Sequence, residues 1–489
     1  MQVSVALSRY FNNFREESPL KLKSTSLMVA GVLLGAAVMP VQADPMLDLL
    51  QVLRDKGTIS AEDYSLLSNA AKAKGEQTAA EKEEIMAKVE SKSSSSVTVD
   101  SKGLNFQSAD KAFTVNIGGR IHADYGFVDD DYFGANNTGI GNEFGNGSQF
   151  RRARLGMNGT MFTDWIYELE INYGGADGDT GFTDAIIGYK GFDSTTIKLG
   201  RHKMPAGLEE LTSSNRISTM ERSMATNTFA LSRFNGLSVE RKGSNWTVMG
   251  GTWMGEGNGD TDNNNKDSDW GAAGRFTFAP IQERNSVVHL GASISYIDFE
   301  KVGGDNQNIR VRQRANRFVN ERPVQVTYND TKSANTYGLE LATIQGPFSL
   351  QGEYFYRTLD RKDFKDADID GWYILGTYTL TGETRGYRDG RMRTISPRNP
   401  VGQGGAGAWE LVARYDELDL WDSSAAREAG SVSGLRGTKA ENWTLGLNWY
   451  VNDNIRFMAN YVDSKIKDSS PNDNTGKIKA FTLRGQVAF

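Results

Sequence analysis

The sequence predicts an all-β transmembrane fold: a 16-stranded antiparallel outer-membrane barrel with an N-terminal periplasmic helical segment. Three observations predict it. From Ala112 onward apolar and polar residues alternate with a period of two, the alternating segments are long enough for tilted membrane strands, and the chain ends on the aromatic residue Phe489. The mean hydropathy of −0.50 argues against helical spans, each of which needs about 20 mostly apolar residues.

Residues 1–43 are typical of a secretory signal peptide. An apolar stretch from Leu27 to Val41 follows two lysines and ends in Val41-Gln42-Ala43, which fits the small-residue pattern of a cleavage site. The alternative is a buried core helix. The chain has no cysteine, so an exported product has no disulfides, and a barrel gains stability by pairing every backbone group between strands.

Residues 44–98 are expected to form a helical segment and a serine-rich linker, followed by the transmembrane barrel over 99–489. Apolar residues recur at helical spacing from Leu47 to Leu53, and Gly57 ends that pattern. Ser60 and Asp63 then suit the N-cap of a second helix. A coiled coil or an ordinary amphipathic helix pair fits this segment.

The alternation after residue 111 is that of membrane strands. In the first segment Phe113, Val115 and Ile117 share one face, and Thr114 and Asn116 share the other. A soluble sandwich also alternates, but here aromatic residues cluster near the segment ends, as interfacial girdles do. We expect the sixteen strands at 112–128, 149–162, 164–174, 182–191, 194–203, 235–242, 245–254, 269–279, 286–299, 334–344, 347–359, 369–380, 407–418, 439–450, 454–464 and 477–489.

The connections mostly alternate long and short, as expected if long loops face outside and short turns face the periplasm. One connection, 381–406, is long where a short turn is expected. Either strands are missed there or the connection folds inward. We favour the second interpretation because long loops in compact folds are usually functional.

Clustered arginines carry the functional prediction in this chain, whose formal net charge is −6. Arg310, Arg312 and Arg314 are spaced by two, so in an extended chain they would form a ladder of guanidinium groups, with Arg317 close behind. Guanidinium stays charged and bonds phosphate or carboxylate oxygens in pairs, and a row of similar sites lets an anion move along it. The alternative is an exposed loop that meets lipopolysaccharide phosphates.

The second predicted strand turns further arginines inward. Leu155 and Met157 face lipid, which directs Arg152 and Arg154 toward the lumen. Arginine on the lipid face would cost about 2–4 kcal/mol near the midplane, so the inward orientation is preferred. Arg151 lies nearer the rim, and its direction is left open.

Two long connections add basic residues that would line a constriction if they fold inward. The acidic residues Glu168, Glu170 and Asp184 also face the lumen, either to pair with the arginines or to form an opposing wall. The basic groups are Lys203, Arg216, Arg222 and Arg233 in one connection, and Arg385, Arg388, Arg391, Arg393 and Arg398 in the other.

At these residues the chain resembles the phosphate-selective porin O/P family of Gram-negative bacteria. The resemblance covers nearly all of the chain after residue 43 and is specific when its motifs are taken together. The terminal alternation ending in Phe489 also resembles a barrel-assembly signal. The motifs are FRRARLGMNG at 150–159, IKLGRHKMPAGLE at 197–209, MER at 220–222 and NPVGQGGAGAWELVARY at 399–415.

The resemblance implies a trimeric porin in which 203–234, 299–333 and 381–406 enter the barrel. It implies an anion ladder at Arg310, Arg312 and Arg314 and a constriction at Arg151, Arg152 and Arg222, which conduct phosphate or polyphosphate. The implied partners are small inorganic anions, outer-membrane lipid and lipopolysaccharide, with no cofactor, metal or nucleic acid.

Two other functions compete with a phosphate channel. A weakly selective general diffusion porin would share the barrel. An outer-membrane lipase would need a serine and a histidine together on the lipid-facing wall, and the three histidines offer no such pair. We therefore expect a passive channel and no enzyme.

Overall fold

The computed structural model describes residues 45–74, 84, 95–131, 146–174, 181–255, 270–299, 307–318, 322–468 and 475–489. The expected signal peptide lies outside the described residues. The chain divides into two compact units, Met1–Lys92 and Ser93–Phe489.

The first unit contains α1 (Pro45–Asp55) and a second helical stretch at 61–74. The hydroxyl oxygen of Ser60 accepts a 3.0 Å hydrogen bond from the backbone N–H of Asp63, which confirms the predicted N-cap. The Arg54 guanidinium lies 4.6 Å from the centre of the Tyr64 ring, so the two helical stretches contact each other. None of the helices in the described residues has the length and apolar character needed to cross a membrane.

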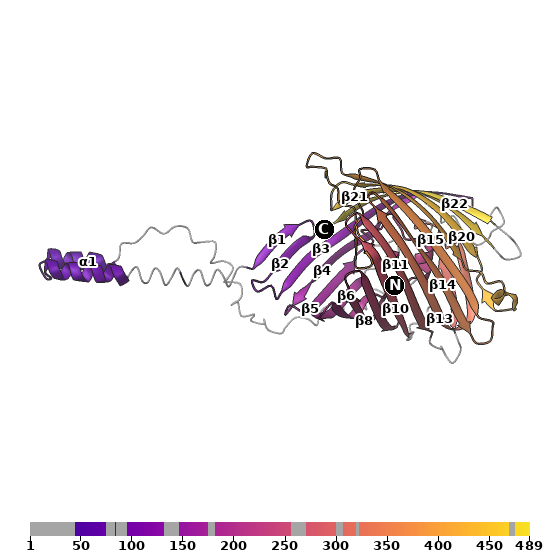
Figure 1. The fold of residues 1–489 in the computed structure, drawn as a ribbon, viewed down its shortest axis with the longest axis horizontal. Helices are drawn as coiled ribbons and strands as arrows, with labels where there is room; N and C mark the ends of the chain where they lie inside the picture. The colour runs from indigo at the N-terminus through magenta and orange to yellow at the C-terminus, as the bar shows by residue number, and fades with distance from the viewer. Residues whose placement is uncertain are drawn as a thin grey trace, which may run out of the picture. The chain divides into compact units, whose positions relative to one another are not determined.

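The second unit is built on a closed antiparallel barrel of sixteen strands (Figure 1), as predicted. Each strand pairs with the next along the chain, and the last pairs with the first. The barrel strands are β3 (Thr114–Asp131), β4 (Gly147–Met161), β5 (Trp165–Asn172), β6 (Gly181–Phe192), β7 (Thr195–Lys203), β8 (Arg233–Lys242), β9 (Trp246–Met254), β10 (Trp270–Gln282), β11 (Ser286–Asp298), β13 (Val324–Gln345), β14 (Phe348–Arg361), β15 (Ala367–Thr379), β18 (Ala408–Asp419), β20 (Lys439–Tyr450), β21 (Ile455–Lys467) and β22 (Thr475–Ala488).

The second unit also contains short strands and helices outside the sixteen wall strands, and the periodicity does not predict them. β1 (Ser96–Asp100) and β2 (Gly103–Gln107) form a hairpin on the first residues of β3. β12 (Gln307–Gln313) and β19 (Val432–Ser433) pair with the N-terminal part of β13, before β13 begins to pair with β11. The connections also hold α3 (Leu208–Leu211), α4 (Met224–Phe229), β16 (Tyr387–Arg388), β17 (Arg391–Met392) and the 3-10 turn η1 (Ala425–Arg427).

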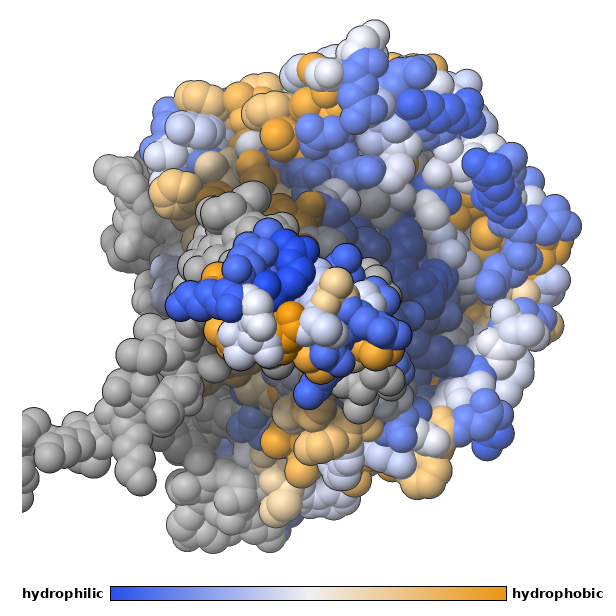
Figure 2. Space-filling model, turned by 90° about the vertical axis from the view of Figure 1, so that its left-hand side faces the viewer, coloured by the Kyte–Doolittle hydropathy of each residue, from blue (hydrophilic) through white to orange (hydrophobic). Residues whose placement is uncertain are grey.

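The barrel wall is apolar outside and polar inside. On β21 the rings of Phe457 and Tyr461 are exposed outward, whereas Arg456 and Asn460 are buried on the lumen side. Figure 2 shows the same division, with hydrophilic residues in the hollow and hydrophobic residues on the flanks. Outward-facing apolar side chains are stable in lipid but not in water, so this pattern favours a membrane barrel over a soluble sandwich.

Aromatic side chains form two separate groups along the outer wall of β18 and β20. Trp409 stacks on Trp449 with ring centres 5.3 Å apart, and Tyr415 contacts Trp443 at 4.9 Å. Each strand carries both groups six residues apart in sequence, which agrees with the girdles expected where a membrane barrel meets the two lipid interfaces.

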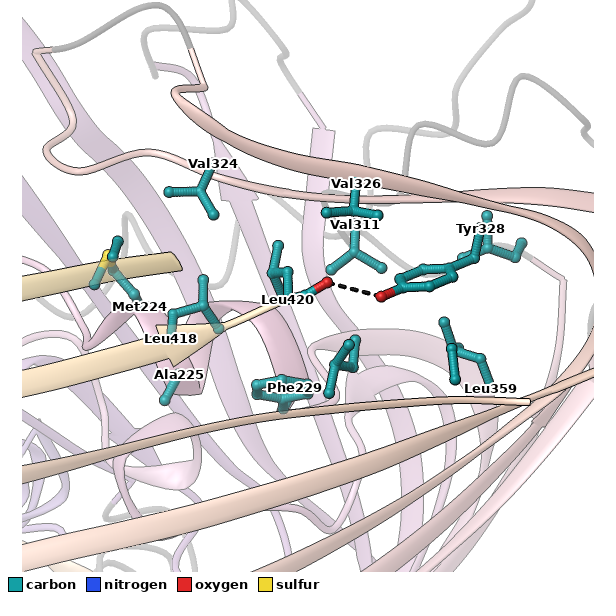
Figure 3. Packing of buried hydrophobic residues seen from close by; sticks show 14 of the residues in the cluster. Met224, Ala225, Phe229, Val311, Val324, Val326, Tyr328, Leu359, Leu418 and Leu420 are labelled. Carbon is teal, nitrogen blue, oxygen red and sulfur yellow. Dashed lines mark hydrogen bonds between the residues drawn. The ribbon is translucent and has the colours of Figure 1, made fainter. Parts of the chain in front are cut away.

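The connection between β7 and β8 is held in the barrel by a buried apolar group, here called the mouth cluster. It joins α4 to β12, to the start of β13 and to the ends of β14 and β18 (Figure 3), and the Tyr328 hydroxyl donates a 2.8 Å hydrogen bond to the Leu420 carbonyl. The labelled members are Met224, Ala225, Phe229, Val311, Val324, Val326, Tyr328, Leu359, Leu418 and Leu420.

Candidate functional site in the barrel lumen

The lumen contains two cavities that meet at four arginines. The larger has a volume of about 1250 Å³ and the smaller about 470 Å³. Four residues line both cavities, and all four are arginine: Arg152, Arg154, Arg222 and Arg233. We call these four residues the constriction. The side chains of these four arginines therefore lie where the two cavities adjoin.

A β-bulge on β4 turns two consecutive arginines toward the lumen. Arg152 pairs with His122 of β3, but the next pair joins Phe150 to Ala123, so Arg151 is the extra residue. Phe150 remains exposed on the outer wall, while Arg151 and Arg152 both line the larger cavity. Strict alternation would send one of the two into lipid; the bulge removes that conflict and settles the direction of Arg151.

Arg154 and Arg233 are each held by a carboxylate of the neighbouring wall. Arg154 bonds Glu170 at 2.9 Å, and the same carboxylate bonds Arg120 at 2.5 Å. Arg233 bonds Asp184 through two nitrogens, the shorter contact being 2.7 Å. Glu170 and Asp184 thus pair with arginines and do not form a separate acidic wall opposite them.

The connection 204–232 lies along the inner wall and carries Arg222. Its guanidinium donates to the carbonyl oxygens of Glu209 and Thr212, both at 3.0 Å, and forms an ion pair with Glu210 at 3.0 Å. The N–H groups of Leu208 and Met220 donate to the side chains of Glu353 and Asn460 on distant wall strands. These bonds confirm that the connection folds inward.

Glu221 in this connection joins three arginines. Arg151 bonds both of its carboxylate oxygens, at 3.0 and 3.1 Å, while Arg484 lies 3.0 Å and Arg152 3.8 Å away. Burial acts to raise the pKa of the Glu221 carboxyl, but these three arginines hold the pKa well below its usual range. Glu221 therefore stays ionised and fixes the arginines around it.

The connection between β11 and β13 reaches across the lumen. The Ala315 carbonyl accepts a 3.3 Å hydrogen bond from Asn442 of β20, and the Phe318 ring packs on Gly126 of β3. A Cβ at Gly126 would lie 2.3 Å from that ring, so only glycine permits the contact. The crossing brings Arg314 and Arg317 into the lining of the larger cavity.

Arg310 and Arg312 are placed differently from Arg314. On β12, Ile309 and Val311 are buried in the mouth cluster, so Arg310 and Arg312 lie half-buried on the opposite face. Neither lines the two cavities. The structure thus groups Arg314 and Arg317 with Arg151, Arg152, Arg154 and Arg222, and leaves Arg310 and Arg312 outside that group.

The connection between β15 and β18 also enters the lumen, as predicted for 381–406. Arg385 bonds Glu410 of β18 at 2.5 Å and donates to the carbonyl of Arg216 in the β7–β8 connection at 3.0 Å. Arg391 bonds Glu240 of β8 at 3.0 Å. Arg388, by contrast, is 74 % exposed.

The two inward connections bring Arg216 close to other arginines. Burial, together with Arg393 and Arg120, lowers the pKa of Arg216 to about 10. Arg216 and Arg393 both line the smaller cavity, so like charges are crowded at the wall of that cavity.

Comparison with known proteins agrees with this geometry. The family model for phosphate-selective porin O and P matches residues 115–489. The chain belongs to this family. Porin O of Pseudomonas aeruginosa is 30% identical over 420 residues, which cover 79% of this chain and 91% of that protein. An uncharacterized protein of Caulobacter vibrioides is 29% identical over 363 residues, 73% of this chain and 69% of its own.

Two solved structures illustrate the more distant likeness of this porin. The anion-selective porin from Comamonas acidovorans covers 77% of this chain and 100% of its own, with 16% identity and a TM-score of 0.48. The outer-membrane channel DcaP of Acinetobacter baumannii covers 78% and 99%, with 12% identity and a TM-score of 0.49. The strand pairings of this chain, and not this likeness, show its barrel. Family and barrel together make the chain an outer-membrane anion channel of the Gram-negative type.

The lumen of this porin is more basic than the chain as a whole. Of the described residues that line the larger cavity, ten are arginine and three carry carboxylates. The excess of positive charge favours anions over cations at the point where the two cavities meet.

Several site residues of the porin are absent from the sequence-based prediction. Arg484 bonds Asp124 through two contacts of 2.7 Å, and Arg484 follows the inward phase of its strand, so the alternation could have found it. Glu221 lies in a loop and offers no such signal. His122 follows the same inward phase of β3 and lies beside Arg152.

Proposed function

We propose that this porin is a passive channel for phosphate or polyphosphate, and that the four constriction arginines select the anion. The observation that carries the proposal is that every residue shared by the two cavities is an arginine. Arg314, Arg317 and Arg151 lead to the constriction from the larger cavity. Arg310 and Arg312 extend this series outward as the proposed ladder.

The chemistry of the guanidinium group supports conduction as well as binding. Each guanidinium has five N–H donors, and a carboxylate partner occupies only part of this set. The remaining donors suit the oxygens of phosphate, which they bond in a planar, two-point manner. Carboxylate partners such as Glu170 and Asp184 hold the side chains extended and weaken each single site. Several similar sites of moderate strength allow an anion to enter and to leave.

A weakly selective general diffusion porin remains the second candidate. The four arginines where the two cavities meet favour the selective channel, because grouped positive charge attracts anions and offers them several donors. The two functions differ in one measurable respect: a phosphate-selective pore binds phosphate inside, so phosphate interrupts the chloride current.

The test is conductance of the purified porin in a planar lipid bilayer. We expect chloride to be preferred over potassium, and millimolar phosphate to block the chloride current. Arg152→Ala removes one charged donor set, so the inhibition constant for phosphate should rise by about tenfold. Arg388→Ala, at an exposed site outside both cavities, is the matched control and should behave as wild type.

Two results would contradict the proposal. Preference for potassium in the wild-type porin would exclude an anion channel. A chloride current that phosphate does not reduce would support the general diffusion porin instead. Unchanged selectivity in Arg152→Ala would remove Arg152 from the proposed constriction.

We further infer the state in which the porin works. Export with removal of residues 1–43, assembly into a trimer and contact with lipopolysaccharide suit an outer-membrane barrel. The segment 44–98 would then lie in the periplasm. Mass measurement of the purified porin in detergent tests both the trimer and the cleavage after Ala43.

A further inference from the structure

His122 contacts the constriction without lining either cavity. It lies on β3 directly across from Arg152 and is fully buried. Its Nδ1 is 3.4 Å from Nη1 of Arg152, and its Nε2 is 2.9 Å from Oδ1 of Asn215. The imidazole thus stands between a constriction arginine and the inward connection.

The chemistry of the neighbours fixes the proton on this ring. A guanidinium can only donate hydrogen bonds, so Nδ1 must carry a lone pair where it faces Arg152. The ring proton then sits on Nε2 and is donated to the amide oxygen of Asn215. Asn215 is itself fixed, because its backbone carbonyl accepts a 3.2 Å hydrogen bond from Gln486 of β22. His122 is therefore neutral in this arrangement and acts as an acceptor toward Arg152.

Arg152 differs from the other constriction arginines in its partner. Arg154, Arg222 and Arg233 each have a carboxylate oxygen at 3.0 Å or less. Within the described residues, the carboxylate that pairs with Arg152 is that of Glu221, at 3.8 Å and already bonded to Arg151 and Arg484. The acceptor within hydrogen-bonding distance of Arg152 is the uncharged imidazole.

We propose that His122 is a positioning residue that holds Arg152 with an uncharged acceptor, so that the full charge of this guanidinium stays available to the passing anion. The inference rests on the proposed function of the constriction. A carboxylate at the same place would fix the arginine equally well, but it would compete with phosphate for the same N–H donors and offset the charge. His122 thereby makes Arg152 the strongest of the four anion sites.

The test compares three substitutions at position 122 in the full-length porin, in planar bilayers, with phosphate as the blocking ion. His122→Glu places a carboxylate against Arg152, so the inhibition constant should rise by about tenfold or more. His122→Gln supplies a neutral carbonyl toward Arg152 and an N–H toward Asn215, so it should stay within about threefold of wild type. His122→Ala removes the acceptor and should fall between the two.

His202→Glu is the matched control. His202 lines the smaller cavity, its Nε2 lies 2.6 Å from the Ser238 hydroxyl, and it does not contact Arg152. The substitution adds the same charge to the lumen at another place. We expect it to raise the inhibition constant less than His122→Glu does.

Several outcomes would overturn the proposal. If His202→Glu matches His122→Glu, the effect comes from the net charge of the lumen and not from Arg152. If His122→Gln is as severe as His122→Glu, the imidazole only ties the connection to the wall. If His122→Glu fails to assemble, the two neutral variants provide the test. The proposal then requires the inhibition constant for phosphate to be lower in His122→Gln than in His122→Ala. Absence of phosphate block in the wild-type porin would instead reject the proposed function itself.

Discussion

At the scale of the residue, Arg484 fixes Glu221, the carboxylate that lies beside Arg152 of the constriction. Its side chain is fully buried, bonds both oxygens of Asp124, and donates to the Met220 carbonyl at 2.6 Å and to Glu221 at 3.0 Å. It thereby joins β22, β3 and the inward connection through one guanidinium. Arginine suits this role because its donors diverge in a plane and its charge persists in a buried site.

Arg484→Gln should therefore destabilise the barrel. The substitution leaves Asp124 as a buried charge without its partner, which costs about 3–5 kcal/mol. Urea unfolding of the porin in lipid vesicles measures the change. Arg388→Gln, at a side chain that is 74 % exposed, should stay within about 0.5 kcal/mol of wild type. Equal stability of the two variants would contradict this account of Arg484.

Residue-scale prediction from the sequence succeeded where alternation holds. Arg152 and Arg154 face the lumen as expected, because an arginine in lipid is costly. The inward turn of Arg151 could not be predicted, since a period of two allows only one of two neighbours to face inward. The bulge that resolves this depends on pairing with β3, which is a property of two strands and not of one sequence segment.

At the scale of the element, α4 shows how a short helix anchors the inward connection. Phe229 stacks on Phe355 of β14 with ring centres 6.1 Å apart, and the guanidinium of Arg357 lies 5.2 Å from its ring centre. The exposed fraction of Phe229 is 1%. The helix is only six residues long, so packing in the mouth cluster stabilises it far more than its own backbone bonds.

Phe229→Ala should loosen the connection. The lost ring leaves a cavity in the mouth cluster, with an expected cost of about 3–5 kcal/mol in unfolding free energy. Single-channel recordings should show noisier current, because the segment that carries Arg222 is less firmly held. Phe276→Ala removes a ring from the outer wall, where the side chain is 51% exposed, and should leave current noise unchanged. A quiet Phe229→Ala channel would show that polar contacts alone hold the connection.

Prediction of elements was complete for the barrel strands and partial elsewhere. All sixteen strands were expected, because long alternating segments bounded by aromatic residues are a strong signal. The inward path of 381–406 was expected from its anomalous length, and Arg385, Met392 and Glu410 confirm it by their contacts. The hairpin β1–β2 and strand β12 were not expected, because both are short and depend on the edge offered by a neighbouring strand.

At the scale of the whole molecule, the barrel closes where β22 meets β3. Phe489 lies at this seam: its backbone exchanges two hydrogen bonds with Gly119, of 2.7 and 3.0 Å. Its ring lies directly over Gly119, where an added Cβ would be 3.2 Å from the ring. The terminal aromatic residue Phe489, which the sequence analysis singled out, thus joins the last strand to the first.

Deletion of Phe489 should lower the yield of folded porin in the membrane. It removes two seam hydrogen bonds, each of about 0.5–1.5 kcal/mol, and the ring that covers Gly119. The folded fraction is measured by the shift of electrophoretic mobility on heating. Phe348→Ala removes an outward ring away from the seam and serves as the control. Channels that do assemble without Phe489 should conduct as wild type; altered selectivity would contradict a role limited to closure.

The partners of the β7–β8 connection lie on strands that are synthesised long after it. Its bonds reach β14 at Glu353, β18 at Asp416, β21 at Asn460 and β22 at Arg484. The connection can therefore be held in place only after these strands, which come late in the sequence, have joined the wall. Contacts so distant in sequence form slowly and late. A barrel without its last strands therefore lacks groups that hold the segment carrying Arg222 against the inner wall.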